Sequence, residues 1–189
     1  MPFRTVVSRY DEGGAAAPAD PGERALAHAL GKAREVAARL GVPPGGAVLG
    51  ADTAVVVGGR WLGKPADRHE AREMIQLLAG REHTVITAVA LISQAAERVR
   101  CDRASVRFRT LSAAAVDWYL QMGEWADRAG AYAIQGAGAA LAERVEGDVT
   151  TVIGLPLGAT LDLLEEVGLA PWSASGRPVG DAGSSRAAR

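Results

Sequence analysis

The sequence predicts an α/β fold in which helices flank a mixed, twisted sheet. Segments with apolar residues at helical spacing alternate along the chain with extended, β-branched segments, a pattern typical of helices packed on a sheet. The 189 residues, 48% of them apolar and 23% charged, suit one well-buried core and leave too little chain for a second full domain. We therefore expect one domain over residues 1–170 and a disordered tail over residues 171–189, where apolar residues are few.

The first predicted elements are a strand and a long helix. Residues 2–8 are β-branched and short, which favours a strand. The helix is expected to begin after Asp20, because its carboxylate can cap free amide groups and Pro21 suits the first helical position. It is expected to end at Gly41. Its predicted apolar face contains Leu26, Leu30, Ala33, Ala37 and Leu40, which recur at helical spacing.

A strand hairpin and a second helix are predicted next. Residues 47–57 form an apolar, extended run, and the glycines at 58–59 suit a two-residue turn into a short strand at 60–62. The following helix is expected to begin after Asp67, with Glu70 three residues on as its capping partner. It is predicted to end at Gly80 and to bury Ala71, Met74, Ile75 and Leu78.

The remaining elements continue this alternation of strands and helices. Residues 82–93 and 98–109 alternate partly between apolar and polar residues and are expected to be adjacent strands of one sheet. Ser112 is expected to cap a third helix that ends near Gly123. The last predicted elements are short strands at 132–135 and 139–145 and a helix from Pro156 to Gly168.

Charge and hydropathy exclude several classes of protein. The formal net charge of −1 provides no strong basic field of the kind that general nucleic-acid binders use. The longest apolar run, residues 85–92, is too short to cross a bilayer, and the N-terminus lacks the features of a secretory signal. Cys101 has no second cysteine with which to form a disulfide. We expect a cytoplasmic protein without nucleic-acid or membrane partners.

A carboxylate interrupts the apolar run at 47–57. Burying Asp52, in the motif GADT, is costly unless the carboxylate is paired, hydrogen-bonded or bound to a cation. Lys64, in the motif LGKP, lies across the predicted hairpin and could approach it. One interpretation is a structural Asp52–Lys64 ion pair. The other is a carboxylate that holds a metal and activates water, with the lysine on a phosphate.

Two more charged residues are candidates for the same site. Glu12 could supply a second carboxylate, and magnesium is usually held by one or two carboxylates together with phosphate oxygens and water. An acidic turn is, however, commonly just solvated. Lys32 falls on the border of the apolar face of its helix, where a surface lysine that extends toward water is the usual explanation.

The third candidate region surrounds the sequence AGAYAIQGAG. The amide of Gln135 offers both a donor and an acceptor, which suits the edge of a nucleobase, although it could also cap the end of a strand. Gly136 and Gly138 lack the third glycine of a dinucleotide-binding loop, which excludes that motif. His83 could be a ligand or a proton carrier, but a single histidine at the start of a strand is more often structural.

Taken together, these stretches resemble the Maf (septum formation inhibitor) family. GADT, LGKP and AGAYxIQG occur in family order within a match that covers most of residues 2–157. The resemblance implies an α/β fold related to inosine-triphosphate pyrophosphatases, a divalent cation (Mg²⁺ or Mn²⁺) and release of pyrophosphate from a nucleoside triphosphate. GADT and YxIQG are similar to the branch that acts on dTTP and UTP, whereas the 7-methyl-GTP branch typically has SDQ and EG.

The resemblance also implies roles for individual residues. Asp52 is expected to be the proton acceptor and, with Glu12, a metal ligand, while Lys64 is expected to contact phosphate. Thr53 and Gln135 are similar to the residues associated with base choice. These two residues argue against a purine-selective pyrophosphatase on the same fold.

Two departures from the family pattern bear on the expected activity. Arg128 stands where the family usually has lysine. This replacement keeps the positive charge but exchanges a compact ammonium group for a planar guanidinium group with several N–H donors. With Lys32, Arg128 is expected to bind the triphosphate. The family usually opens with an apolar strand and a phosphate-binding Ser-x-Ser-Pro-Arg-Arg loop, and this sequence starts after them. The alternative function is therefore a nucleotide-binding or division-associated regulatory protein with impaired catalysis. A homodimer is compatible with the sequence, which does not determine the oligomeric state.

Overall fold

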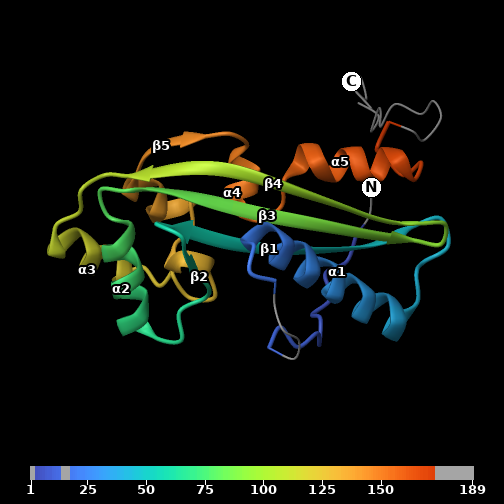
Figure 1. Ribbon diagram of the computed structural model, residues 1–189, viewed down its shortest axis with the longest axis horizontal. Helices are drawn as coiled ribbons and strands as arrows, with labels where there is room; N and C mark the ends of the chain where they lie inside the picture. The colour runs from blue at the N-terminus through green and yellow to red at the C-terminus, as the bar shows by residue number, and fades with distance from the viewer. Residues whose placement is uncertain (1–2, 14–17, 173–189) are drawn as a thin grey trace, which may run out of the picture.

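A five-stranded antiparallel sheet with helices on both faces forms the centre of the computed structural model, which describes residues 3–13 and 18–172 (Figure 1). The strand order is β2-β1-β3-β4-β5. The predicted α/β fold is confirmed, and all the described strand pairings are antiparallel. The strands are β1 (Ala47–Val57), β2 (Arg60–Leu62), β3 (Glu82–Ser93), β4 (Glu97–Phe108) and β5 (Ala142–Glu146).

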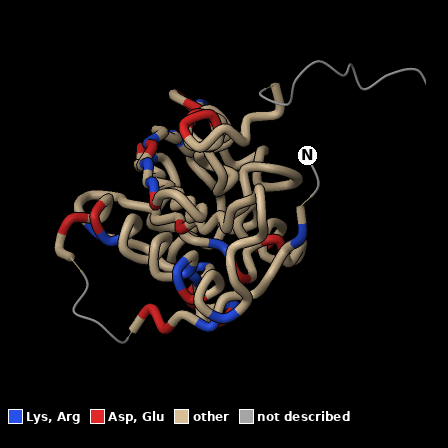
Figure 2. The backbone as a smooth tube through the Cα atoms, turned by 90° about the vertical axis from the view of Figure 1, so that its right-hand side faces the viewer, with Lys and Arg blue, Asp and Glu red and all other residues tan. Residues whose placement is uncertain are grey.

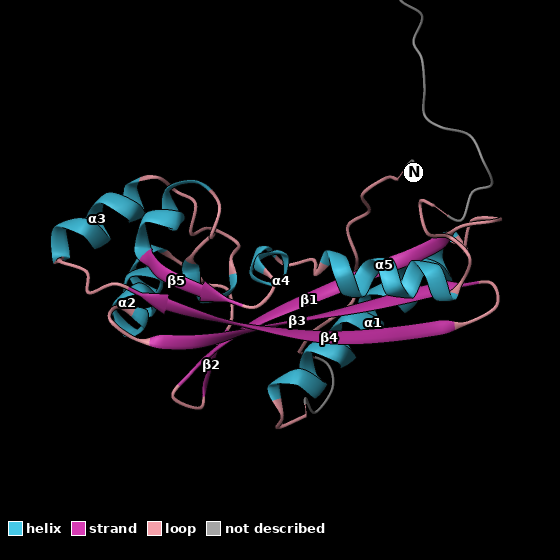
Figure 3. Ribbon diagram, turned by 90° about the horizontal axis from the view of Figure 1, so that it is seen from above, coloured by secondary structure: helices cyan, strands magenta, loops and turns pink. Residues whose placement is uncertain are grey.

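The helices occupy both sides of this sheet and one of its ends (Figure 3). The α-helices are α1 (Pro21–Leu40), α2 (Arg68–Leu78), α3 (Ala113–Gln121), α4 (Val149–Ile153) and α5 (Leu157–Glu166), and two 3₁₀ segments are η1 (Ala129–Ala131) and η2 (Gly136–Leu141). None of the helices in the described part of the chain combines the length and apolar character needed to cross a bilayer. Basic and acidic residues are interspersed over the molecule (Figure 2).

The central strand β3 separates two parts of the hydrophobic core. Because successive strand residues point to opposite faces, Ile86, Ala88, Ala90 and Ile92 pack toward α1, whereas Val89 and Leu91 pack with Leu163 and Leu164 of α5. A third cluster, at the end of the sheet near α2 and α3, contains the buried rings of Phe108, Tyr119 and Tyr132. These clusters bury β3 on both faces.

Helix α1 begins and ends as predicted and lies close to the sheet. The Asp20 carboxylate accepts hydrogen bonds from the amides of Gly22 and Glu23, at 2.8 and 2.9 Å. The residues it buries toward the sheet are small, Ala25, Ala29 and Ala33, while Leu40 of the predicted apolar face is exposed. Small side chains let the helix backbone approach β1 at Gly50, where a Cβ atom would lie 2.5 Å from the Ala29 carbonyl oxygen.

Most of the other predicted elements are confirmed at close to their expected bounds. The two glycines at 58–59 have φ of 55° and 77° and join β1 to β2, as the primed hairpin turns require. Asp67 caps α2 through the amide of Glu70, and Ser112 caps α3 through the amide of Ala115. Strands β3 and β4 pair directly.

The predicted strand at 2–8 is wrong for its described residues 3–8. These residues pair with no described strand, and the side chains of Phe3 and Val7 are exposed. Polar contacts to α1 hold the segment instead, because Glu35 accepts hydrogen bonds from Ser8 and from the amide of Arg9. A β-branched segment becomes a strand only when its backbone pairs with a sheet, and here the contacts to α1 hold the segment away from such a pairing.

The C-terminal half contains two further differences. Residues 132–135 lie between η1 and η2 and are not a strand, because positive φ angles at Gly130 and Gly136 turn the chain on both sides. The strand predicted at 139–145 appears only as β5. Helix α4 was not predicted, and its five residues are too few for a helical periodicity to be visible. Of the predicted tail, residues 173–189 lie outside the described residues, and the single-domain boundary at 170 stays a prediction.

We predict that Gly50→Ala lowers the free energy of unfolding by about 1–3 kcal/mol, because the added methyl group has no room beneath α1. Gly158→Ala is the matched control, since a Cβ atom there meets nothing within 4 Å. It should be neutral or slightly stabilising. Urea unfolding of both variants measures the difference, and equal stabilities would contradict the close approach of α1 to β1.

Candidate active site

The candidate site surrounds the outer edge of β1. Strand β2 pairs only with Val55–Val57, so among the described residues no strand covers the outer edge of β1 from Ala47 to Ala54. Asp52 is paired with Ala88 and therefore points to the α1 face, whereas Thr53 is paired with Thr87 and points to the opposite face. A cavity of about 350 Å³ reaches both side chains around this edge.

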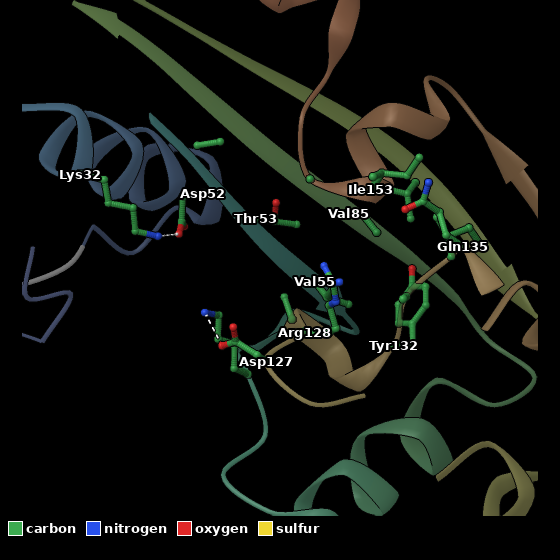
Figure 4. Close-up of a pocket in the computed structure, with 17 residues that line it drawn as sticks. Lys32, Asp52, Thr53, Val55, Val85, Asp127, Arg128, Tyr132, Gln135 and Ile153 are labelled. Atoms are coloured by element: carbon green, nitrogen blue, oxygen red, sulfur yellow. Dashed lines mark hydrogen bonds and ion pairs between the residues drawn. The ribbon is translucent and has the colours of Figure 1, made fainter. Parts of the chain in front are cut away.

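The structure brings all seven sequence-predicted residues to this region. Figure 4 labels five of them, Lys32, Asp52, Thr53, Arg128 and Gln135. The main cavity is lined by six of them, Lys32, Asp52, Thr53, Lys64, Arg128 and Gln135. Glu12 lines an adjoining cavity of about 130 Å³, which shares Asp52, Thr53 and Lys64 with the first. Their proximity is thus observed, while their individual roles stay predictions.

Lys32 lies between the two predicted metal-site carboxylates. Its Nζ is 2.6 Å from Asp52 Oδ1 and 2.7 Å from Glu12 Oε1. The Asp52 side chain is only 11% exposed, so this pairing accounts for the burial of its charge. The interpretation of Lys32 as a solvated surface lysine is therefore wrong.

The N-terminal segment is what carries Glu12 to this position. The ring of Tyr10 lies against α1 where Gly31 has no side chain, because a Cβ atom there would be 2.3 Å from the ring. The same ring packs edge-on against His28. Contacts of Ser8 and Arg9 with Glu35 fix the preceding residues. Glu12 thus depends on tertiary contacts rather than on an element of its own.

The predicted Asp52–Lys64 ion pair is wrong, because Lys64 pairs with Asp127. Lys64 Nζ lies 2.7 Å from Asp127 Oδ1, and both side chains are largely exposed. Asp127 has φ of 61°, a conformation uncommon for a residue with a side chain. The amide of Gly130 donates to the carbonyl of Gly63 at 3.0 Å, which fastens the turn at 127–131 to the chain beside Lys64. Asp127 is a site residue that the sequence analysis did not single out, although it directly precedes Arg128.

Besides these charged residues, the main cavity is lined by uncharged side chains of the described chain. Gln135 and Thr53 provide its polar groups, and Val55, Val85 and Ile153 provide apolar walls. Tyr132 also lines it, and the Tyr132 hydroxyl lies 2.9 Å from Nε2 of the buried His83. This contact confirms the structural interpretation of His83.

Comparison with known proteins agrees with this arrangement. Residues 1–167 match the family model described as Maf-like protein. The chain belongs to the Maf family. It is 46% identical over 168 residues to a dTTP/UTP pyrophosphatase of Symbiobacterium thermophilum, a match that covers 89% of this chain and 84% of the relative. Proteins with the same description from Myxococcus xanthus and Deinococcus radiodurans are 50% and 42% identical, covering 76% and 91% of this chain and 72% and 86% of theirs.

The charged end of this Maf site has altered proton affinities. Burial raises the pKa of Asp52, and the hydrogen bond and charge of Lys32 only partly offset this rise. Burial acts on Glu12 in the same direction, but Lys32 outweighs it and lowers the pKa of Glu12. For Lys32, burial alone would lower the pKa, whereas the two carboxylates together raise it. Asp52 is thus the stronger proton acceptor of the two carboxylates.

The two carboxylates on Lys32 suit a hard divalent cation as ligands. Mg²⁺ and Mn²⁺ prefer carboxylate oxygens, and Mg²⁺ usually combines one or two of them with water and substrate phosphates. The described residues contain no group of three or more His, Cys, Asp or Glu that could hold a metal on its own. The donor set of this Maf protein therefore fits an ion that completes its coordination with the substrate.

We predict that the free energy of unfolding falls as the pH falls from about 6.5 toward 4, with His83 as one cause. Burial lowers the pKa of His83 to about 4, so in this range the unfolded chain binds a proton that the folded chain does not. His83→Gln should therefore flatten this dependence, whereas His69→Gln, at an exposed position on α2, should not. Urea unfolding between pH 7 and 4 measures the slopes, and parallel slopes for wild type and His83→Gln would contradict the assignment.

Proposed function

We propose that this chain is a nucleoside triphosphate pyrophosphatase that converts UTP and dTTP to the monophosphate and pyrophosphate. The observation that carries the proposal is a single cavity with two chemically different ends, reached from the two faces of β1. Five of the side chains that line it are charged, those of Lys32, Asp52, Lys64, Asp127 and Arg128, and the remaining lining residues are uncharged polar or apolar ones. A nucleotide has the same division between phosphates and base. The description of the relatives as dTTP/UTP pyrophosphatases supports this substrate class.

The charged end is formally neutral before a substrate arrives. Three cations face three carboxylates there, namely Lys32, Lys64 and Arg128 with Glu12, Asp52 and Asp127. A triphosphate adds several negative charges, which would repel these carboxylates at short range. A divalent cation removes this repulsion, and for this reason we propose that Mg²⁺ or Mn²⁺ is required.

We propose Glu12 and Asp52 as the protein ligands of this ion. When bound, the ion would neutralise the triphosphate and polarise the phosphorus that is attacked. Both carboxylates contact Lys32 Nζ in the structure, so they are close enough to share one cation. Lys32 would then be free to contact a phosphate oxygen. Arg128 can bind two phosphate oxygens through its planar guanidinium, and Lys64 adds a point charge.

Asp52 is proposed to accept the proton of the attacking water. Its raised pKa favours this role, and Lys32 contacts Oδ1, while among the described residues no hydrogen bond engages Oδ2. The water oxygen forms a bond to the α-phosphorus, and the bond from that phosphorus to the oxygen bridging the β-phosphate breaks. Pyrophosphate leaves with the bonding electron pair, and Asp52 later returns the proton to solvent.

The proposed partner is therefore a free nucleotide. We propose that the protein acts in the cytoplasm without nucleic-acid or membrane partners, which is consistent with the net charge of −1 and the interspersed surface charges (Figure 2).

We predict that the wild type releases pyrophosphate and UMP from UTP in the presence of Mg²⁺ or Mn²⁺, and that Asp52→Asn lowers kcat by about 10²-fold or more. The amide keeps the size of the side chain but binds a proton only weakly. Asp162→Asn, at an exposed position on α5, is the control and should keep wild-type rates. Wild-type turnover in Asp52→Asn would exclude Asp52 as the base. Binding of UTP by the wild type without pyrophosphate release would favour the regulatory alternative.

A second prediction concerns the metal. Activity should disappear with excess EDTA, and Glu12→Gln should raise the Mg²⁺ or Mn²⁺ concentration needed for half-maximal rate by about tenfold. Glu73→Gln, at an exposed position on α2, controls for the loss of one negative charge. Metal titrations at saturating UTP measure the effect. Identical titration curves for wild type and Glu12→Gln would contradict the assignment of Glu12 as a metal ligand.

A further inference from the structure

A row of polar side chains crosses the middle of the sheet beside the uncharged end of the cavity. Thr53 of β1 is paired with Thr87 of β3, and Thr87 is paired with Asp102 of β4. Directly paired residues share a face, so all three point toward α4. Thr87 is fully buried in β3, where its nearest buried neighbours along the strand are apolar. A hydroxyl in such a place destabilises the fold unless it is hydrogen-bonded.

The hydrogen bonds of this row have a defined direction. The Thr87 hydroxyl donates to the carbonyl oxygen of Thr151 at 2.7 Å, because a carbonyl can only accept. A hydroxyl carries one proton, so Thr87 has none left for Thr53, whose Oγ1 lies 2.9 Å away. Thr53 must therefore be the donor in that bond. Its own proton points to Thr87, and only its lone pairs face the cavity.

The end of the chain of hydrogen bonds is held in place by α4 and β4. Thr151 is fully buried, and its hydroxyl donates to Asp102 Oδ2 at 3.1 Å. Its carbonyl also accepts from the amide of Gly154 at 3.2 Å, and Asp148 caps the helix at the amide of Thr150. These contacts keep the Thr151 carbonyl aimed at Thr87, and the proton order from Thr53 to Thr151 cannot reverse.

We propose that Thr87 is a positioning residue that makes Thr53 a permanent hydrogen-bond acceptor, and that this polarity selects bases with an N3–H. Uracil and thymine carry that proton, whereas N3 of cytosine is itself an acceptor and would face the Thr53 lone pairs without a hydrogen bond. Gln135 cannot make this distinction alone, because its amide can rotate to present either a donor or an acceptor. The proposal rests on the proposed function and assigns one source of its base selectivity.

The test compares kcat/KM for UTP and CTP in Thr87→Val and Thr87→Ser. Valine keeps the shape of threonine without its hydroxyl, so the Thr53 proton is released and can be donated to N3 of cytosine. We expect the ratio of UTP to CTP to fall about tenfold in Thr87→Val, mainly because CTP is used better. Serine keeps the hydroxyl and should keep the wild-type ratio.

Thermal melts of both variants separate this effect from a general loss of packing. Loosened packing would lower the rates for UTP and CTP together, whereas the proposal requires their ratio to change. An unchanged ratio in folded Thr87→Val overturns it. If Thr87→Val does not fold, kcat/KM of the wild type for UTP and CTP provides the test. Equal values overturn the proposal, and a clear preference for UTP supports it.

The outcomes also separate this proposal from the proposed function. If the wild type releases pyrophosphate from no nucleotide, the proposed function fails. In that case, calorimetry measures how tightly the wild type and both variants bind UMP and CMP, which tests the contact with the base without turnover. Tighter binding of UMP that is lost in Thr87→Val supports the role of Thr87, and equal binding of UMP and CMP overturns it. If Thr87→Val hydrolyses UTP with unchanged selectivity, the proposed function stands and only the proposed role of Thr87 is rejected.

Discussion

The close packing of α1 on β1 is the constraint on which the site depends. Gly50 and the alanines of α1 let the two backbones approach until no methyl group fits between them. Asp52 lies two residues after Gly50, on the same face of β1. The close spacing therefore places Lys32 Nζ 2.6 Å from Asp52 Oδ1. The N-terminal segment then packs on α1 through Tyr10 and adds Glu12 to the same ammonium group. The position of α1 thus sets the geometry of the Lys32, Asp52 and Glu12 cluster.

The edge position of β1 explains how two adjacent residues take part in different chemistry. Successive side chains of a strand point to opposite faces, so Asp52 and Thr53 would normally lie in separate environments. At an edge, a ligand can pass around the strand and contact both. Asp52 therefore meets Lys32 on the α1 face, Thr53 lies on the α4 face, and both line the same cavity. The short length of β2 leaves this part of the edge accessible among the described residues.

The two ends use their polar groups in different ways. At the charged end, Lys32 and Lys64 form ion pairs that a substrate and a cation would replace in the proposed function. At the uncharged end, Thr53 and the buried Thr87 and Thr151 form a chain of hydrogen bonds with a single proton order. Exchangeable charges suit a ligand whose charge changes during reaction, whereas a fixed donor and acceptor pattern suits recognition of a base that stays unchanged.

The helix caps, the hairpin and the central strands could be predicted from the sequence, because Asp20, the glycines at 58–59 and the apolar runs act through neighbours close in the chain. The sequence also singled out Asp52, since a carboxylate within an apolar strand is locally anomalous, and the resemblance to the Maf family implied roles for other residues of the cavity, but not for Asp127. Only the tertiary structure decided which charges pair, replacing Asp52–Lys64 by Asp52–Lys32 and Lys64–Asp127. Residues 3–8 and 132–135 depended on it as well, because contacts with Glu35 hold the first segment and the turns at Gly130 and Gly136 shape the second, and local spacing encodes neither.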